Sequence, residues 1–362
     1  NYLAIDDLES ALVEARKANG YLFRYNRDNE GRRTYANDAF VQYVAGLLHA
    51  SAGDLNDALV SLRQADQAFE RYRASFGIRP PRVFAEDLVR LAAAAGVPEV
   101  AEAAARKYGV TEPPGLPPGT RATTQEGELL VIVENGFVAH RTEEKVYVPV
   151  LRSERAMIGS GSIDEIVKAA MVIAVRTVFF MNQASREGRR YLRDYEGLLV
   201  LGSAALDAEL ISFAWPAYVL DGNAVDEIVV ELAGSDPVDA VPVEDLSAIS
   251  VRDFEEEKPK VLLRMLARVL LKETAVSRTA AAATKQGGEV VGFLARLGAR
   301  TAATLTERAD VRSWSLLPDE VRIARFTLPP GQHPLSIRVR DAGRGPWRRV
   351  DLGTVEIRNR RT

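Results

Sequence analysis

Residues 43–65 read YVAGLLHASAGDLNDALVSLRQA, and this stretch decides how the first third of the chain folds. Apolar side chains recur at intervals of three and four residues on both sides of Gly53, which is the spacing of amphipathic helices. Gly53 suits a tight turn, and Asp54 stands directly before the second apolar run, where a carboxylate can cap a helix N-terminus. The stretch predicts two antiparallel helices joined by a short turn.

The positions at which these two helices would cross carry small or compact residues. In a tetratricopeptide repeat such residues let two antiparallel helices approach closely. The residues that match this pattern are Ala45, Gly46, Gly53, Ala58, Leu62 and Ala65. Residues 11–18 resemble the second helix of a preceding unit, whose first helix would lie before Asn1, and residues 81–107 resemble a degenerate third unit. A plain helical bundle is the alternative interpretation of the same small residues.

Several phrases spread over the chain extend the resemblance beyond a generic repeat. They are Asn1-Tyr-Leu3, Ala11-Leu-Val-Glu-Ala-Arg16, Tyr43-Val-Ala-Gly-Leu-Leu48, Asn56-Asp-Ala-Leu59, Ala309-Asp-Val-Arg-Ser-Trp314 with Leu317-Pro318, and Leu328-Pro-Pro-Gly331. Together they resemble a poorly characterised family of bacterial cell-envelope proteins with tetratricopeptide-like N-terminal repeats. Members are often lipoproteins and are often encoded beside lipoprotein activators of penicillin-binding proteins.

This resemblance implies a location and no particular reaction. It places the chain in the bacterial periplasm or at the outer membrane, with peripheral or lipid-anchored membrane association. The lipid-bearing cysteine of such proteins is not in this chain and would precede Asn1. The family has no established activity.

A Pro/Gly-rich linker is predicted over residues 109–126. Four prolines fall within Gly109–Gly119, and proline lacks the N–H group that helices and central strands require. The linker separates a tetratricopeptide-like helical repeat domain, residues 1–108, from a β-rich domain, residues 127–362. The predicted fold class is α+β, with the helical repeats followed by a β-sandwich-like domain that has helical insertions at about residues 163–206 and 243–308.

Turn signals in the β-rich domain predict three hairpins. Their turns are Asn135-Gly136, Asp221-Gly-Asn223 and Pro329-Pro-Gly331, each between two runs of strand-forming residues. Within the second helical insertion, helix breaks are expected at Pro259 and at Gln286-Gly-Gly288.

The composition excludes several classes of chemistry. The 362 residues include no cysteine and only three histidines, and the net charge is -3. Without cysteine there is no thiol catalysis, disulfide, Cys-ligated zinc or iron–sulfur cluster. The histidines stand far apart in the sequence, so we expect no cofactor, no metal site and no catalytic residues. A nearly neutral chain is also a poor non-specific ligand for nucleic acid.

Two sets of residues are candidates for contact with other molecules. In the groove of the repeats, Gln42, Tyr43, His49 and Arg63 are the expected partner-binding residues. Small residues in the segment 275–305 recur at three-to-four spacing, which permits close helix–helix approach; they are Gly288, Gly292, Ala295, Ala299 and Ala302. An intramolecular helix hairpin and an oligomer interface are both open interpretations of that segment.

The sequence therefore predicts a non-enzymatic scaffold or adaptor of the cell envelope that binds a protein or peptide through its N-terminal helices. One alternative is a structural subunit of a homo-oligomeric ring or filament, assembled through residues 275–305. Another is an enzyme acting on envelope glycan, which would need two carboxyl groups on opposite sides of a sugar cleft.

Overall fold

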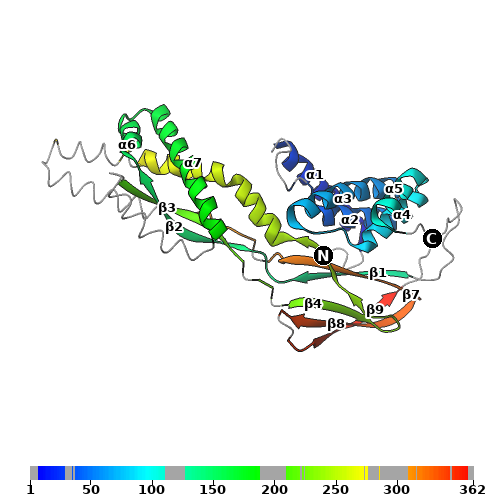
Figure 1. Ribbon diagram of the computed structural model, residues 1–362. Helices are drawn as coiled ribbons and strands as arrows, with labels where there is room; N and C mark the ends of the chain where they lie inside the picture. The colour runs from blue at the N-terminus through cyan, green and yellow to red at the C-terminus, as the bar shows by residue number, and fades with distance from the viewer. Residues whose placement is uncertain are drawn as a thin grey trace. The chain divides into compact units, whose positions relative to one another are not determined.

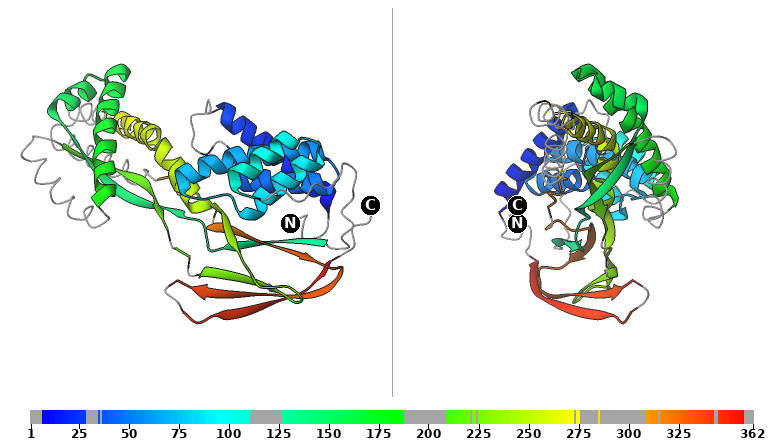
Figure 2. Two further views of the ribbon diagram at one scale, coloured as in Figure 1. Left: turned by 45° about the vertical axis from the view of Figure 1, so that its right-hand side comes forward. Right: turned by 90° about the vertical axis from the view of Figure 1, so that its left-hand side faces the viewer.

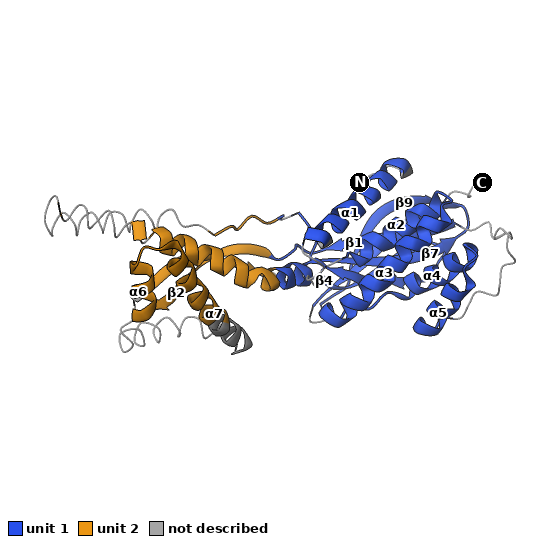
Figure 3. Ribbon diagram, turned by 90° about the horizontal axis from the view of Figure 1, so that it is seen from above, with its two compact units in different colours: residues 1–139, 220–253, 314–362 blue, residues 140–219, 254–313 orange. Residues whose placement is uncertain are grey.

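A computed structural model describes most of the chain as two compact units. The described residues are 7–28, 35, 37–110, 127–187, 209–220, 222–223, 225–272, 274–275, 285, 309–314, 316–342 and 345–357. Residues 1–139, 220–253 and 314–362 belong to the first unit, and residues 140–219 and 254–313 belong to the second (Figure 3). The chain leaves the first unit and returns to it twice. The fold mixes helices and sheets, which confirms the α+β prediction at that level.

The N-terminal part of the first unit is a layer of five helices (Figure 1). They are α1 (Leu8–Asp28), α2 (Ala39–Ser51), α3 (Leu55–Phe76), α4 (Arg82–Ala94) and α5 (Pro98–Tyr108). Asp38 caps α2 by accepting a hydrogen bond from the Val41 N–H at 2.7 Å. Asp54 caps α3 in the same way as the sequence predicts, accepting from the Asp57 N–H at 3.3 Å.

Helices α2 and α3 cross closely at Gly46. A Cβ atom on this residue would lie 2.9 Å from the Leu62 side chain and 3.2 Å from the Ala58 carbonyl oxygen. Between them, Gly53 turns the chain with a φ of 86°, in the left-handed region that glycine enters at least cost. The predicted pair of antiparallel helices and their turn are therefore present.

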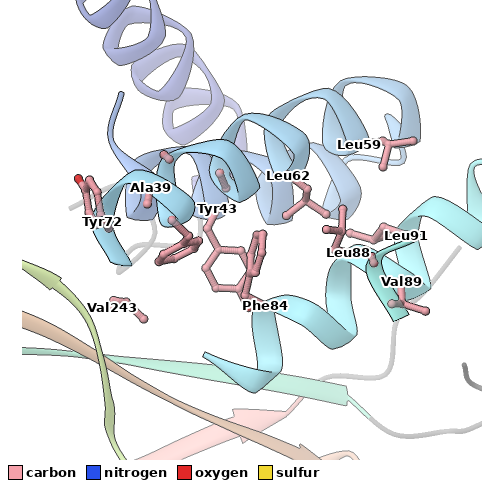
Figure 4. Packing of buried hydrophobic residues seen from close by; sticks show 14 of the residues in the cluster. Ala39, Tyr43, Leu59, Leu62, Tyr72, Phe84, Leu88, Val89, Leu91 and Val243 are labelled. Atoms are coloured by element: carbon pink, nitrogen blue, oxygen red, sulfur yellow. The ribbon is translucent and has the colours of Figure 1, made fainter. Parts of the chain in front are cut away.

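A three-stranded antiparallel sheet lies beneath the helices, in the strand order β1-β7-β6. The strands are β1 (Gly127–Asn135), β7 (Glu320–Leu328) and β6 (Val241–Asp245). Inward-facing residues of this sheet, including Val243 and Ile323, share one core with Tyr43, Phe84 and other side chains of the helices (Figure 4). This shared core is why the first unit contains both the helices and these strands.

The opposite face of that sheet packs on a second sheet, which has the order β5-β4-β8-β9. Its strands are β4 (Val225–Leu232), β5 (Val238–Asp239), β8 (Gly331–Asp341) and β9 (Arg348–Ile357). Phe326 and Leu328 of β7 join Ile228 and Val230 of β4 in the core between the two sheets. Figure 2 shows the resulting order of layers in the first unit: helices, first sheet, second sheet.

All three predicted hairpins are wrong. Strands flank the second and third turns, whereas the first turn is preceded by a strand and followed by residues 137–139, which are not in a strand. Strand β1 pairs with β7, so Asn135-Gly136 leads out of the first sheet. Strand β3 (Glu209–Val219) pairs with β2 (His140–Val150) and not with β4. Pro329 and Pro330 connect β7 in one sheet to β8 in the other. Local turn residues show where a strand ends, but the partner strand is chosen by the buried faces that it can cover.

The second unit is built on a two-stranded antiparallel sheet of β2 (His140–Val150) and β3. Helices α6 (Arg152–Gly159) and α7 (Ile163–Glu187) follow β2, and a further helix covers residues 246–272, of which 254–272 belong to this unit. Ile173 of α7 packs with Trp215 of β3 and with Leu266 in one core.

Several predicted features of the insertions need correction or lie outside the described residues. The helix over 246–272 continues through Pro259, so the break predicted there is wrong. Proline removes one helical hydrogen bond and bends a helix more readily than it ends one when packing holds both halves; Phe254, Leu262 and Leu266 hold them here. Most of the linker 109–126 and the part of the predicted insertion 163–206 that follows Glu187 lie outside the described residues.

The predicted domain division also differs from the compact units. Residues 1–108 do not form a unit of their own, because their core is completed by Val243, Val321 and Ile323. Across the part of the chain that the structure describes, no helix combines the length and the apolar character needed to cross a membrane.

Candidate functional site

Two clusters of buried polar side chains join the helical layer to the first sheet. We call them the Asp87 cluster and the Glu244 cluster after their central carboxyl groups. Both central residues are almost inaccessible to solvent, with exposed fractions of 0% for Asp87 and 3% for Glu244. Buried carboxyl groups are costly unless they are paired or protonated, so each cluster is a place where the fold has a specific chemical requirement.

The Asp87 cluster is balanced in charge. Arg325 of β7 approaches both carboxylate oxygens of Asp87 through one guanidinium nitrogen, at 2.6 and 2.7 Å, and Arg90 approaches Oδ1 at 2.6 Å. The Tyr43 hydroxyl donates to Oδ2 at 2.8 Å. Glu128 of β1 lies 3.5 Å from Arg90 and 3.6 Å from Arg325. Two carboxylates and two guanidinium groups thus link α2 and α4 to the sheet.

The Glu244 cluster is acidic. Glu244 of β6 is close enough to Asp38 for the two carboxyl groups to interact, and the Tyr72 hydroxyl lies 3.5 Å from the Oε1 atom of Glu244. Asp38 also accepts from the Tyr35 hydroxyl at 2.9 Å. Among the described residues, neither Asp38 nor Glu244 forms an ion pair with Lys or Arg. The cluster therefore gathers two carboxyl groups and two phenols, and no described Lys or Arg side chain pairs with either acid.

Burial is the largest cause of the raised pKa values of Glu244, Tyr72 and Tyr43. It raises the pKa of Glu244 well above the ordinary glutamate value, and the nearby Asp38 raises it further. Burial likewise raises the pKa of Tyr72, with Asp38 and Glu244 adding to the effect. For Tyr43 burial again raises the pKa, and the Asp87 carboxylate adds to it. A protonated Glu244 carboxyl group can donate a hydrogen bond to the Asp38 carboxylate. The two acids can then lie side by side without repulsion between two negative charges.

Neither central carboxyl group was predicted as important from the sequence. Asp87 stands on the same helical face as Phe84, Leu88 and Leu91, and a charge on an apolar stripe is a signal that could have identified it. Glu244 gives no such signal. The pairing of β6 with β7 shifts between Pro242 and Glu244, and this irregularity lets Val243 and Glu244 both be buried.

Three of the four predicted partner-binding residues are buried and cannot form the surface of a groove. Gln42, Tyr43 and His49 have exposed fractions of 2%, 0% and 5%. Tyr43 is held by Asp87, and Gln42 donates from Nε2 to the Asn19 Oδ1 atom at 2.6 Å. The prediction is wrong for these three because the chain's own helices and sheet cover them. Arg63 is exposed on α3, so its predicted role in partner binding stays a prediction.

The residues predicted to pack the repeat lie between the helices. Ala45, Ala58, Leu62 and Ala65 have exposed fractions of 0%. Gly46 and Gly53 occupy the crossing and the turn described above. The predicted oligomer residues Gly288, Gly292, Ala295, Ala299 and Ala302 lie outside the described residues.

Helix α1 is the least covered helix of the N-terminal layer. Ala11 is its one buried residue among those whose side chains are described, whereas Tyr21 and Phe23 are 65% and 69% exposed. The Arg24 guanidinium lies 4.7 Å from the centre of the Tyr21 ring. Large exposed aromatic side chains are typical of surfaces that bind other proteins.

One group of side chains in the described part of the chain brings three potential metal ligands together. It consists of His49 at the end of α2 and Asp54 and Asp57 at the start of α3.

No protein-family model matches the chain, and no curated protein or solved structure does so either.

Proposed function

We propose that the chain is a non-enzymatic scaffold or adaptor that binds a protein or peptide partner through its N-terminal helical layer. The binding surface in this proposal is α1. The observation that carries the proposal is that Tyr21 and Phe23 are about two-thirds exposed on a helix whose inner face alone packs on the layer. A short helical array leaves the face of its terminal helix open to another element.

The rest of the layer suits a rigid platform for such binding. Asp87 and Arg325 join the helices to the sheet, and Asn19 and Tyr25 hold α1 by hydrogen bonds to Gln42 and Asp253 at 2.6 and 2.7 Å. A helix that is fixed before it binds loses less conformational freedom on association. The exposed aromatics would then act as anchors that need little rearrangement.

The proposal also includes a tetratricopeptide-like pair of helices and a β-sandwich-like pair of sheets. The close crossing at Gly46 and the turn at Gly53 support α2 and α3 as a tetratricopeptide-like pair. The core shared by β7 and β4 supports a β-sandwich-like arrangement of the two sheets. Placement in the periplasm or at the outer membrane rests on the family resemblance of the sequence.

The experiment compares partner capture by matched variants. Wild-type chain and the double variant Tyr21→Ser/Phe23→Ser are immobilised, exposed to cross-linked bacterial envelope extract, and the captured proteins are quantified by mass spectrometry. Val60→Ser is the control, since Val60 is a 54% exposed apolar residue on α3 of the same layer. We expect one or more partners to be lost with the double variant and retained with the control. Equal capture by all three proteins would reject α1 as the binding surface.

A further inference from the structure

The turn between α2 and α3 holds three side chains in a fixed arrangement. The Asp54 N–H donates to the His49 carbonyl oxygen at 2.9 Å, and Gly53 supplies the left-handed residue between them. These backbone features bring the last turn of α2 beside the first turn of α3. As a result, His49, Asp54 and Asp57 each point a potential ligand atom into one space.

The ligand atoms are close enough for a single ion. The His49 ring nitrogen and one oxygen from each of Asp54 and Asp57 all lie within 4.8 Å of one another. The Nδ1 atom of His49 is 4.0 Å from Oδ2 of Asp54. Ligands of a tetrahedral zinc ion, with bonds of about 2.0–2.1 Å, stand roughly 3.3 Å apart, so small side-chain rotations complete the geometry.

His49 provides a second and independent observation. Its side chain is 7% exposed, and its Nδ1 atom is buried without a hydrogen-bond partner. A buried polar atom of this kind is normally satisfied in a folded protein. Here it faces Asp54, whose Oδ1 is used by the helix cap and whose Oδ2 lies toward the ring. A cation between the three side chains would supply a partner for Nδ1.

We propose that His49, Asp54 and Asp57 bind a divalent transition-metal ion of the Zn²⁺ class. One imidazole nitrogen and two carboxylate oxygens suit such an ion, whereas Ca²⁺ and Mg²⁺ take oxygen ligands alone. The three protein ligands leave a coordination position open for water or for an oxygen atom of another molecule. The sequence prediction of no metal site considered the three histidines together, but this site requires only one of them.

The charges and helix dipoles around the turn between α2 and α3 favour a bound cation. The two aspartates bring two negative charges, which outweigh the roughly +0.5 charge equivalent at the N-terminus of α3. His49 lies in the last turn of α2, where the helix dipole favours positive charge. Helix capping explains Asp54, and the helix dipole favours an acid at Asp57 in the first turn of α3, but neither explains the orphaned Nδ1 atom of His49.

The test uses the full chain without a histidine tag. Zn²⁺ is titrated by calorimetry, and Co²⁺ is used as a spectroscopic probe of nitrogen and oxygen ligation. The informative variant is Asp57→Asn, since Asp57 is exposed and its change should not disturb folding. Glu99→Gln is the matched control because Glu99 is an exposed carboxylate in the first turn of α5. His49→Gln tests the buried ligand, with circular dichroism to verify its fold.

We expect wild type to bind one Zn²⁺ per chain and to gain thermal stability from it by mass action. Asp57→Asn should weaken binding by about 100-fold, at the upper end of the effect of losing a supporting residue, because a ligand itself is removed. Glu99→Gln should bind as wild type does. The proposal is overturned if wild type shows no saturable Zn²⁺ binding, or if Asp57→Asn binds as tightly as wild type.

Discussion

The Asp87 and Glu244 clusters occupy the same helix–sheet junction but satisfy a buried carboxyl group in opposite ways. Asp87 is paired with two guanidinium groups, those of Arg90 and Arg325. Glu244 faces another acid and two phenols, and its raised pKa favours the uncharged form. The comparison teaches that the neighbours decide how a buried carboxyl group is accommodated: cations pair with it, whereas a second acid adds to the effect of burial on its pKa. It also predicts that the Glu244 cluster makes stability depend on pH.

The largest expected effect is the loss of the Asp87 carboxylate. Asp87→Ala leaves Arg325, which is 14% exposed, without its main counter-charge. Removing one partner of a buried ion pair costs about 3–5 kcal/mol of unfolding free energy. Urea unfolding measures it. Glu86→Ala is the control on the same helix, since its pairing with the largely exposed Arg82 is worth little. Comparable losses in both variants would show that Asp87 has no special role.

The two buried phenols should differ in their contributions. The Tyr43 hydroxyl donates to a carboxylate at 2.8 Å, and such a charged hydrogen bond contributes about 1.5 kcal/mol or more. The Tyr72 hydroxyl is 3.5 Å from Glu244, at the outer limit of a hydrogen bond. Tyr43→Phe should therefore lower the free energy of unfolding more than Tyr72→Phe does. The reverse order, measured by the same urea titration, would contradict the assigned contacts.

A smaller effect, with a characteristic pH dependence, is expected for Glu244→Gln. The folded chain holds the Glu244 proton to higher pH than the unfolded chain, so wild-type stability from this group falls as pH rises above about 4.5. An uncharged glutamine keeps a donor for Asp38 and loses this dependence. The variant should therefore become more stable relative to wild type as the pH rises from about 5 to about 8.

Thermal unfolding of wild type and variant between about pH 5 and pH 8 measures this difference. Glu134→Gln is a suitable control, because Glu134 is an exposed acid on β1 of the same sheet. Its curve should remain parallel to that of wild type. A constant gap between wild type and Glu244→Gln at every pH would mean that Glu244 titrates normally.

The local sequence was sufficient to predict features that depend on residues only a few positions apart. The spacing around Gly53 predicted α2, α3 and the Asp54 cap, because helix periodicity and capping involve residues only a few positions apart. The same holds for the existence of most strands. It was insufficient for strand pairing: β1 finds its partner in β7, nearly two hundred residues later, although Asn135-Gly136 is a good hairpin turn.

The candidate sites differ in the same way: one is formed by residues close together in the sequence, and two are formed by distant residues. His49, Asp54 and Asp57 are within nine residues of one another, so their meeting follows from a helix turn that the sequence itself determines. Asp87 and Glu244 acquire their character only in the tertiary structure. Arg325 reaches Asp87 from a strand 238 residues away, and the irregular pairing of β6 turns Glu244 toward Asp38. Local periodicity determines which residues share a helix face, but the cost of burying a charge depends on neighbours that only the assembled layers supply.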